Sequence, residues 1–169
     1  GTGFIPKGYG FTLQNRGQGF SLDDAHPNCV APGKRPFHTI IPAIVTRADP
    51  GGKRELLYAT MTNMGAFMQP QGHVQLLLNL VAYGMDPQEA VDQPRFCIVS
   101  GTSGGAVAIE DGISENVLQG LRAMGHDAPR LTSHERSAFG RAQIITRRSE
   151  DGVLCGGSDP RGDGCAIGY

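Results

Sequence analysis

Two stretches of the sequence carry residue types that could do chemistry, a small-residue turn and a basic loop. In the turn, Gly65 and Ala66 come directly before an apolar, helix-like segment. Small side chains leave consecutive backbone N–H groups accessible, and donors near the start of a helix can face an accumulating negative charge. Gly65 and Ala66 are therefore candidates for an oxyanion hole, where they would have a catalytic role.

The basic loop has the sequence P-G-K-R-P-F-H-T over residues 32–39. Its prolines make the backbone rigid, and the loop leads straight into a strand-like segment. It is therefore suited to presenting Arg35, His38 and Thr39 to an anionic ligand. A structural role for Lys34 and Arg35 explains the same residues equally well.

A third pattern, G-T-S-G-G over residues 101–105, fits the G-x-S-x-G signature of a serine nucleophile. That signature requires a strand, a sharp turn and then a helix. The following segment, A-V-A-I over residues 106–109, contains β-branched side chains and precedes Glu-Asp-Gly, which indicates a second strand. Residues 101–105 are therefore interpreted as a hairpin turn, and Ser103 as a residue without a catalytic role.

Three further features favour structural roles. His73 lies in an apolar helical segment, where a core histidine is more common than a catalytic base. The tripeptide Arg161-Gly162-Asp163 matches a cell-adhesion motif, but turn chemistry explains its glycine and aspartate better. The cysteines have neither C-x-x-C spacing nor a histidine at metal-site distance, which predicts free, buried thiols and no metal site. They are Cys29, Cys97, Cys155 and Cys165.

Length and charge restrict the class of protein. The chain has 169 residues, about the length of one domain, so residues 1–169 are expected to form a single domain. The formal net charge of −1 offers no basic surface for nucleic-acid phosphates. No apolar run reaches the roughly 18 residues that a membrane-spanning helix needs. Neither nucleic acid nor a membrane is therefore expected as a partner.

Turn residues and apolar spacing predict the strands that must position these side chains. The expected strands cover residues 4–5, 11–13, 39–45, 55–62, 96–99, 106–109, 143–147 and 153–155. Asp49-Pro50-Gly51-Gly52 and Glu150-Asp151-Gly152 are turn sequences, so each is expected to join an antiparallel hairpin. Paired strands with two or three helices indicate an α+β fold.

Capping residues and helical spacing predict the helices. A helix is expected from Pro70 to Val81, because Pro70 suits a first helical position and apolar residues follow at helical spacing. Apolar residues lie on both sides of this helix, so it is expected to be buried over most of its surface. A short helix capped by Asp86-Pro87-Gln88-Glu89 should end before Pro94, and Ser114 should cap a third helix.

Spaced motifs in a fixed order cover almost the whole chain. In this order they resemble the small, C-terminal subunit of the gamma-glutamyltransferase (gamma-glutamyltranspeptidase) family of N-terminal-nucleophile hydrolases. The motifs are Gly1-Thr2-Gly3, Gln14-Asn15, residues 32–36, Gly65-Ala66, residues 90–96, residues 157–161 and Gly168-Tyr169.

The resemblance implies an αββα sandwich built with a large subunit after self-cleavage of a precursor. It implies a threonine at the new N-terminus that attacks a γ-glutamyl amide, forms an acyl-enzyme and passes the acyl group to water or an amine, without metal or other cofactor. The matching nucleophile would precede Gly1, and Thr2 matches a position downstream of it. The chain is therefore expected to be most of a small subunit, an incomplete sandwich that is inactive alone.

The resemblance also assigns roles to individual residues. Gly65 and Ala66 match the glycine pair that holds the oxyanion. The residues expected to bind the acyl end of the substrate are Asn15, Arg16, Arg35, His38 and Thr39. His38 and Thr39 stand where the family has two serines that bind the substrate α-carboxylate, and both can donate hydrogen bonds.

One departure from the family leaves alternative functions open. Gly19 stands where the family has an acidic residue for the substrate α-ammonium, and Arg16 precedes it at a polar contact. Without the carboxylate the ammonium is unpaired, so Arg16 could instead attract a second substrate carboxylate. This favours an acylase of the same family that cleaves dicarboxylic acyl amides, such as glutaryl amides of the cephalosporin type. A truncated, non-catalytic domain is the other alternative, and unpaired cysteines favour the cytoplasm over the periplasm.

Overall fold

The computed structural model describes residues 1–168, so Tyr169, the last residue of the final motif, lies outside the described residues. By its internal contacts the chain divides into two compact units, Gly1–Ile40 and Ile41–Tyr169, and each is described by itself. The expected single domain stays a prediction.

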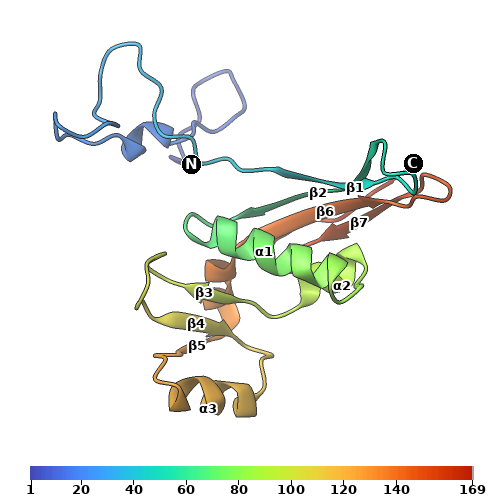
Figure 1. Ribbon diagram of the computed structural model, residues 1–169. Helices are drawn as coiled ribbons and strands as arrows, with labels where there is room; N and C mark the ends of the chain where they lie inside the picture. Colours follow the sequence, from blue (N-terminus) through green and yellow to red (C-terminus); the bar gives the residue numbers. More distant parts are fainter. Residues whose placement is uncertain (169) are drawn as a thin grey trace. The chain divides into compact units, whose positions relative to one another are not determined.

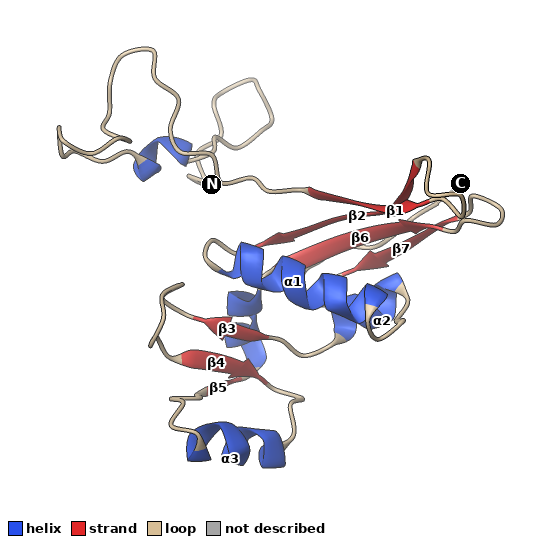
Figure 2. Cartoon of the chain, in the orientation of Figure 1, coloured by secondary structure: helices blue, strands red, loops and turns tan. Residues whose placement is uncertain are grey.

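The first unit consists mainly of loops and turns, with one short 3-10 helix, η1 (Arg16–Gly19) (Figure 2). The prediction of strands at residues 4–5 and 11–13 is wrong. Two backbone hydrogen bonds do join these segments, from Thr2 to Leu13 and from Leu13 to Phe4. Pro6 and glycines with positive φ lie between the segments and bend the backbone away from a continued ladder.

The second unit contains a four-stranded antiparallel sheet with the strand order β1-β2-β6-β7 (Figure 1). Its strands are β1 (Ala43–Ala48), β2 (Glu55–Met64), β6 (Arg141–Arg147) and β7 (Leu154–Ser158). Both predicted hairpins, β1–β2 and β6–β7, are confirmed. The first strand begins at Ala43, four residues later than predicted.

Two helices, α1 (Met68–Val81) and α2 (Pro87–Asp92), cover one face of this sheet (Figure 1). The capping box of α2 is confirmed, because Asp86 accepts from the backbone of Gln88 and Glu89 while Glu89 accepts from the backbone of Asp86. Helix α1 begins two residues before Pro70.

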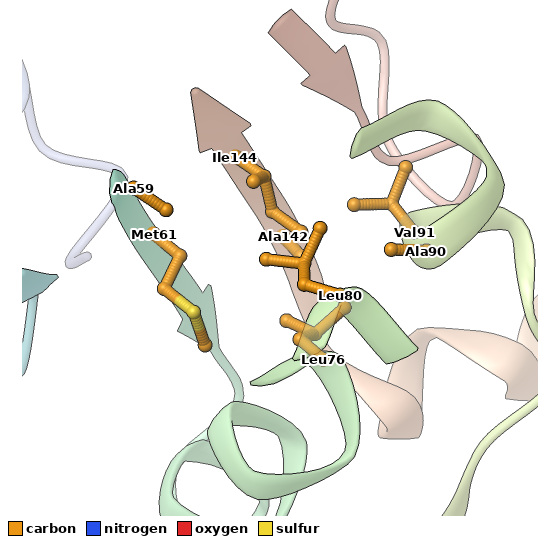
Figure 3. Packing of buried hydrophobic residues seen from close by; sticks show 8 residues of the cluster. All are labelled: Ala59, Met61, Leu76, Leu80, Ala90, Val91, Ala142 and Ile144. Carbon is orange, nitrogen blue, oxygen red and sulfur yellow. The ribbon is translucent and has the colours of Figure 1, made fainter. Parts of the chain in front are cut away.

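The core lies between these helices and the sheet (Figure 3). Helices α1 and α2 contribute Leu76, Leu80, Ala90 and Val91, and the strands contribute Ala59, Met61, Ala142 and Ile144. The prediction that α1 is buried over most of its surface is wrong, because Val74, Leu78 and Val81 are 58%, 45% and 54% exposed. Only one side of α1 faces the sheet.

The opposite face of the sheet carries exposed apolar side chains. Ile44 and Ile145 both pair with Thr60 in the ladder and are 73% and 48% exposed. Neighbouring strand residues point to opposite faces, so these side chains lie away from α1 and α2. The second unit therefore has one sheet face covered by helices and one open face on which Ile44 and Ile145 are exposed.

A second, three-stranded sheet has the strand order β3-β4-β5. Its elements are β3 (Phe96–Ile98), β4 (Val107–Glu110) and β5 (Arg130–Leu131), with α3 (Glu115–Ala123) between β4 and β5 and η2 (Ser133–Phe139) after them. The predicted β3–β4 hairpin is confirmed. Ser103 is exposed in the turn between these strands, and a strand follows where a nucleophile elbow needs a helix.

Glutamine side chains attach the helices to the edges of both sheets. In α1, Gln71 bonds the N–H and C=O of Ile98, and Gln75 bonds the N–H and C=O of Phe96. In α2, Gln88 forms the same pair of bonds with Ser158 of β7. A residue at the edge of a sheet has no neighbouring strand on one side to bond its N–H and C=O groups. Each carboxamide bonds these two groups in place of a strand.

A buried ion cluster joins the ends of several elements. Its members are Arg95, Glu110, Arg136, Asp159 and Arg161, and all except Arg136 have side chains at most 2% exposed. Arg95 lies 2.8 Å from Asp159, and Arg161 contacts both Asp159 and Glu110. Arg161 also donates to the carbonyls of Val91 and Gln93 at the end of α2. Its burial excludes the adhesion-motif interpretation of residues 161–163.

The carboxyl group of Asp159 is held in its charged form. Burial works against the charge, but the Arg95 guanidinium and the backbone N–H groups of Arg161 and Ala142 outweigh it and lower the pKa of Asp159 below its usual value. Such a group stabilises the fold above its unfolded pKa of about 4, and the contribution is lost as the pH falls through the lower, folded pKa.

Asp159→Asn should break the buried ion pair while keeping the shape of the side chain. Because Arg95 is then buried without its direct carboxylate partner, we expect the free energy of unfolding to fall by about 3–5 kcal/mol at neutral pH. Urea titrations at several pH values measure this loss. Wild type should lose stability below about pH 4, and the variant should lack that part of the loss.

Asp151→Asn is the matched control. Asp151 pairs with Arg148 on the exposed surface, where an ion pair contributes little to stability. Equal losses at neutral pH in the two variants would show that the buried ion cluster is not what stabilises the fold.

Candidate functional site

The loop formed by Gly65 and Ala66, called the 65–66 loop below, connects β2 to α1. Its residues have φ values of 139° and 52°, both in the left-handed region. Their carbonyl oxygens accept hydrogen bonds from Met68 and Gln69. Within residues 1–168, the N–H groups of Gly65 and Ala66 have no hydrogen-bond acceptor. The loop thus presents consecutive unpaired donors.

Close packing explains why the 65–66 loop adopts this conformation. A Cβ atom on Gly65 would lie 3.1 Å from the Met68 Cβ and 3.2 Å from the Gly140 Cα. Gly140 also has a positive φ, and a Cβ on it would lie 2.2 Å from the Met64 carbonyl oxygen. Glycines on both sides therefore let two backbone segments approach closely.

The electrostatics of the loop suit an anion. Phe67 occupies the N-cap of α1 and supplies no side-chain hydrogen bond to the helix. The N-terminus of an α-helix carries a partial positive charge and unpaired N–H groups. The unpaired donors of Gly65 and Ala66 therefore lie at the positive end of a 14-residue helix, an arrangement that can stabilise the oxyanion of acyl transfer.

The residues expected to bind the acyl group all lie in the first unit. Asn15 precedes η1 and donates to Gln18 at 3.2 Å, and Arg16 is half-buried within η1. Arg35 and His38 are exposed, and Thr39 is half-buried. Within the described residues, the side chains of Arg16, Arg35 and His38 form no hydrogen bond or ion pair, so each can accept a ligand.

Asn28 ties together the two segments that carry these residues. Its Nδ2 donates to the Gly19 carbonyl at 2.7 Å, and its Oδ1 accepts from the Phe37 N–H at 3.2 Å. The η1 turn and the basic loop are thereby joined within the first unit. Sequence reasoning missed Asn28, and only its position between Pro27 and the basic loop hinted at a role in a turn.

The candidate residues lie in two separate groups. Gly65 and Ala66 are adjacent in the second unit, and Asn28 joins the two segments that carry the acyl-binding candidates in the first. That both groups form one site stays a prediction.

Other residues with reactive side chains have structural partners or lack neighbours that would activate them. The Thr2 hydroxyl donates to the Leu13 carbonyl and accepts from the Phe4 N–H, so Thr2 stabilises a turn. His73 Nδ1 lies 2.6 Å from the Gln69 carbonyl, and its Nε2 is buried without a partner in the described residues. The four cysteines are free, but only Cys97 is fully buried. No helix within residues 1–168 is long and apolar enough to cross a membrane.

Known proteins that are similar to this chain in fold or sequence include acylases, amidohydrolases and gamma-glutamyltranspeptidases. A cephalosporin acylase from Bacillus halodurans superposes with a TM-score of 0.76 at 40% identity, over 93% of this chain and 28% of that chain. The gamma-glutamyltranspeptidase family model matches residues 1–169, and the chain therefore belongs to the gamma-glutamyltranspeptidase family.

Two relatives show the range of names within this family. The glutathione hydrolase-like YwrD proenzyme of Bacillus subtilis is 39% identical over 163 residues, covering 94% of this chain and 29% of the relative. The oxamate amidohydrolase proenzyme of Klebsiella pneumoniae is 36% identical over 171 residues, covering 100% of this chain and 31% of the relative. The chain thus spans less than a third of the length of these relatives.

Gly65→Ala tests the conformation of the 65–66 loop. Alanine would have to adopt φ of 139° and move two close neighbours, so we expect a loss of about 1–3 kcal/mol in the free energy of unfolding. Ala66→Gly is the matched control, because φ of 52° favours glycine and no loss is expected. Thermal unfolding compares them, and equal melting temperatures would be inconsistent with the left-handed loop.

Asn28→Ala should release the basic loop from η1, because both hydrogen bonds of the carboxamide disappear. We expect faster backbone hydrogen exchange at Phe37, with exchange in the second unit unchanged. Asn15→Ala, which loses only a local bond to Gln18, serves as the control. If exchange at Phe37 were the same in both variants, Asn28 would not be the link between the segments.

Proposed function

We propose that this chain is the major part of the small subunit of a larger precursor that hydrolyses or transfers a γ-glutamyl or similar acyl group. The observation that carries the proposal is the 65–66 loop, with unpaired N–H groups at the uncapped N-terminus of α1. Membership of the gamma-glutamyltranspeptidase family supports the same reaction class.

In the proposed mechanism the nucleophile is the hydroxyl of an N-terminal threonine from the segment preceding Gly1. A bond forms between the threonine hydroxyl oxygen and the acyl carbon of the substrate. The electrons of the carbonyl double bond move onto the carbonyl oxygen, and the N–H groups of Gly65 and Ala66 stabilise the negative charge that develops there. The C–N bond then breaks, and the amine leaves with the proton that the hydroxyl gave up. Water or an amine attacks the acyl-enzyme and restores the threonine.

The proposed partner is the large subunit from the N-terminal part of the same precursor. Ile44 and Ile145 are exposed on the open sheet face, and apolar side chains on a sheet are usually buried against another layer. A second sheet on this face would complete an αββα sandwich, with α1 and α2 as one of the outer layers.

A second candidate function, cleavage of dicarboxylic acyl amides, is favoured by Arg16. Its guanidinium has no acidic partner in the described residues, and Gly19 supplies no carboxylate for a substrate ammonium group. An arginine in this position pairs with a carboxylate and repels an ammonium. A glutaryl group, which ends in a carboxylate and has no α-ammonium, therefore fits better than a γ-glutamyl group.

The complete precursor should be assayed with γ-glutamyl and glutaryl anilides. Arg16→Gln should raise KM for the glutaryl substrate about 10- to 150-fold, because a hydrogen bond to a charged group is worth roughly 1.5–3 kcal/mol. It should not raise KM for the γ-glutamyl substrate, because it also removes the repulsion between Arg16 and the substrate α-ammonium group. Arg54→Gln, in the exposed β1–β2 turn of the second unit, is the matched loss of charge and should change neither value.

The assay separates the alternatives. Good hydrolysis of the γ-glutamyl anilide with none of the glutaryl anilide rejects the acylase function. A precursor that processes correctly and cleaves neither anilide points to the non-catalytic alternative.

A further inference from the structure

Asn63 is a fully buried polar residue near the end of β2, two residues before Gly65. Its carboxamide is packed unusually tightly. A Cβ on Gly72 of α1 would lie 1.9 Å from Asn63 Nδ2, and a Cβ on Gly140 would lie 2.5 Å from Asn63 Oδ1. Gly72 in α1 and Gly140, which lies between η2 and β6, therefore make room for this one side chain.

Asn63 also connects the 65–66 loop to the buried ion cluster. Its Oδ1 accepts a hydrogen bond from Arg95 Nη1 at 3.4 Å, and the same nitrogen donates to the Phe139 carbonyl at 3.1 Å. Phe139 precedes Gly140, whose Cα is in close contact with Gly65. The carboxamide thus lies between Arg95 and the backbone segment on which the loop rests.

The hydrogen bonding of Asn63 is poor for a residue that serves only stability. Its Nδ2 is buried and has no partner in the described residues. An unpaired buried donor destabilises a fold, and an apolar side chain of similar size would avoid this cost. Groups that break such a rule are expected where function requires them.

We propose that Asn63 is a positioning residue that holds Gly65 and Ala66 in the geometry needed to bind an oxyanion. Its volume separates α1 from Gly140, and its Oδ1 accepts from Arg95, which fixes the Phe139–Gly140 backbone against the loop. The proposal rests on the function proposed above, because the loop matters for catalysis only if the reaction passes through an oxyanion.

The test compares three variants of the complete precursor in the glutaryl and γ-glutamyl anilide assays. Asn63→Ala removes both the volume and the acceptor. It should lower kcat about 100-fold with KM changed less than threefold, because a small misplacement of the donors weakens transition-state binding but not substrate binding.

Asn63→Asp is the conservative rescue variant. It keeps the volume and the acceptor for Arg95, and its charge is balanced because the buried ion cluster has three arginines and two carboxylates. Its kcat should stay within about threefold of wild type. A loss of kcat as large as that of Asn63→Ala would overturn the proposal.

Asn79→Ala is the matched control. Asn79 also carries a partly buried carboxamide, but it donates to the Ala90 carbonyl at the far end of α1. It should lose stability without losing kcat. If Asn63→Ala lowers kcat no more than Asn79→Ala at a similar loss of stability, Asn63 has only a structural role. Should Asn63→Ala fail to fold, Asn63→Ser, which is too short to reach Arg95, replaces it under the same criteria.

A backbone measurement separates failure of this proposal from failure of the proposed function. If wild type cleaves neither anilide, the function fails, but the geometry of the loop can still be measured. The three-bond couplings between the amide and α protons of Gly65 and Ala66, which depend on φ, should change in Asn63→Ala and not in Asn79→Ala. Identical couplings in the two variants would overturn the positioning role whatever the activity.

Discussion

The second unit depends on the ion cluster around Asp159. Two carboxylates and three arginines hold the end of α2, the start of β3, the end of β4 and the segment after β7 at one point. All of these charges except that of Arg136 are buried and therefore need charged partners. Arg95 extends the cluster to the Phe139 carbonyl, and from there close glycine contacts reach the 65–66 loop. On the proposal made above, the geometry of the Gly65 and Ala66 N–H groups depends on this ion cluster through Arg95 and the Phe139–Gly140 backbone.

The sequence predicts those parts of the fold that local chemistry determines. Turn residues located both hairpins of the four-stranded sheet, and the Asp86–Glu89 capping box located the start of α2. The buried side of α1 could not be predicted, because apolar residues surround the helix and only packing against the sheet selects one side. The strands expected at residues 4–5 and 11–13 do not form, because the glycines and the proline between them interrupt their pairing.

The candidate site was predictable only for residues that belong to a motif. Gly65 and Ala66 were proposed as oxyanion donors because small residues before a helix indicate accessible backbone N–H groups, and that role stays a prediction. Asn28, Asn63 and Glu110 were missed, because each acts through partners distant in the sequence and no local pattern marks them. Turn chemistry was assigned to Gly162 and Asp163, but no role was predicted for the guanidinium of Arg161, which belongs to the buried ion cluster. A short motif shows which residues lie together but not which of them is buried.

The two units are proposed to have different roles, oxyanion stabilisation and selection of the acyl group, and these roles match the difference in their rigidity. In the second unit, ladder hydrogen bonds, a packed core and buried charges fix the 65–66 loop, as the stabilisation of a developing charge requires. The first unit consists mainly of turns and carries the side chains proposed to select the acyl group. Loops tolerate substitution better than buried elements do. Exchanges at Arg16 or His38 should therefore change the preferred acyl group while the oxyanion geometry stays the same. Such a division would fit a family whose members are named as a glutathione hydrolase-like proenzyme, an oxamate amidohydrolase proenzyme and a cephalosporin acylase.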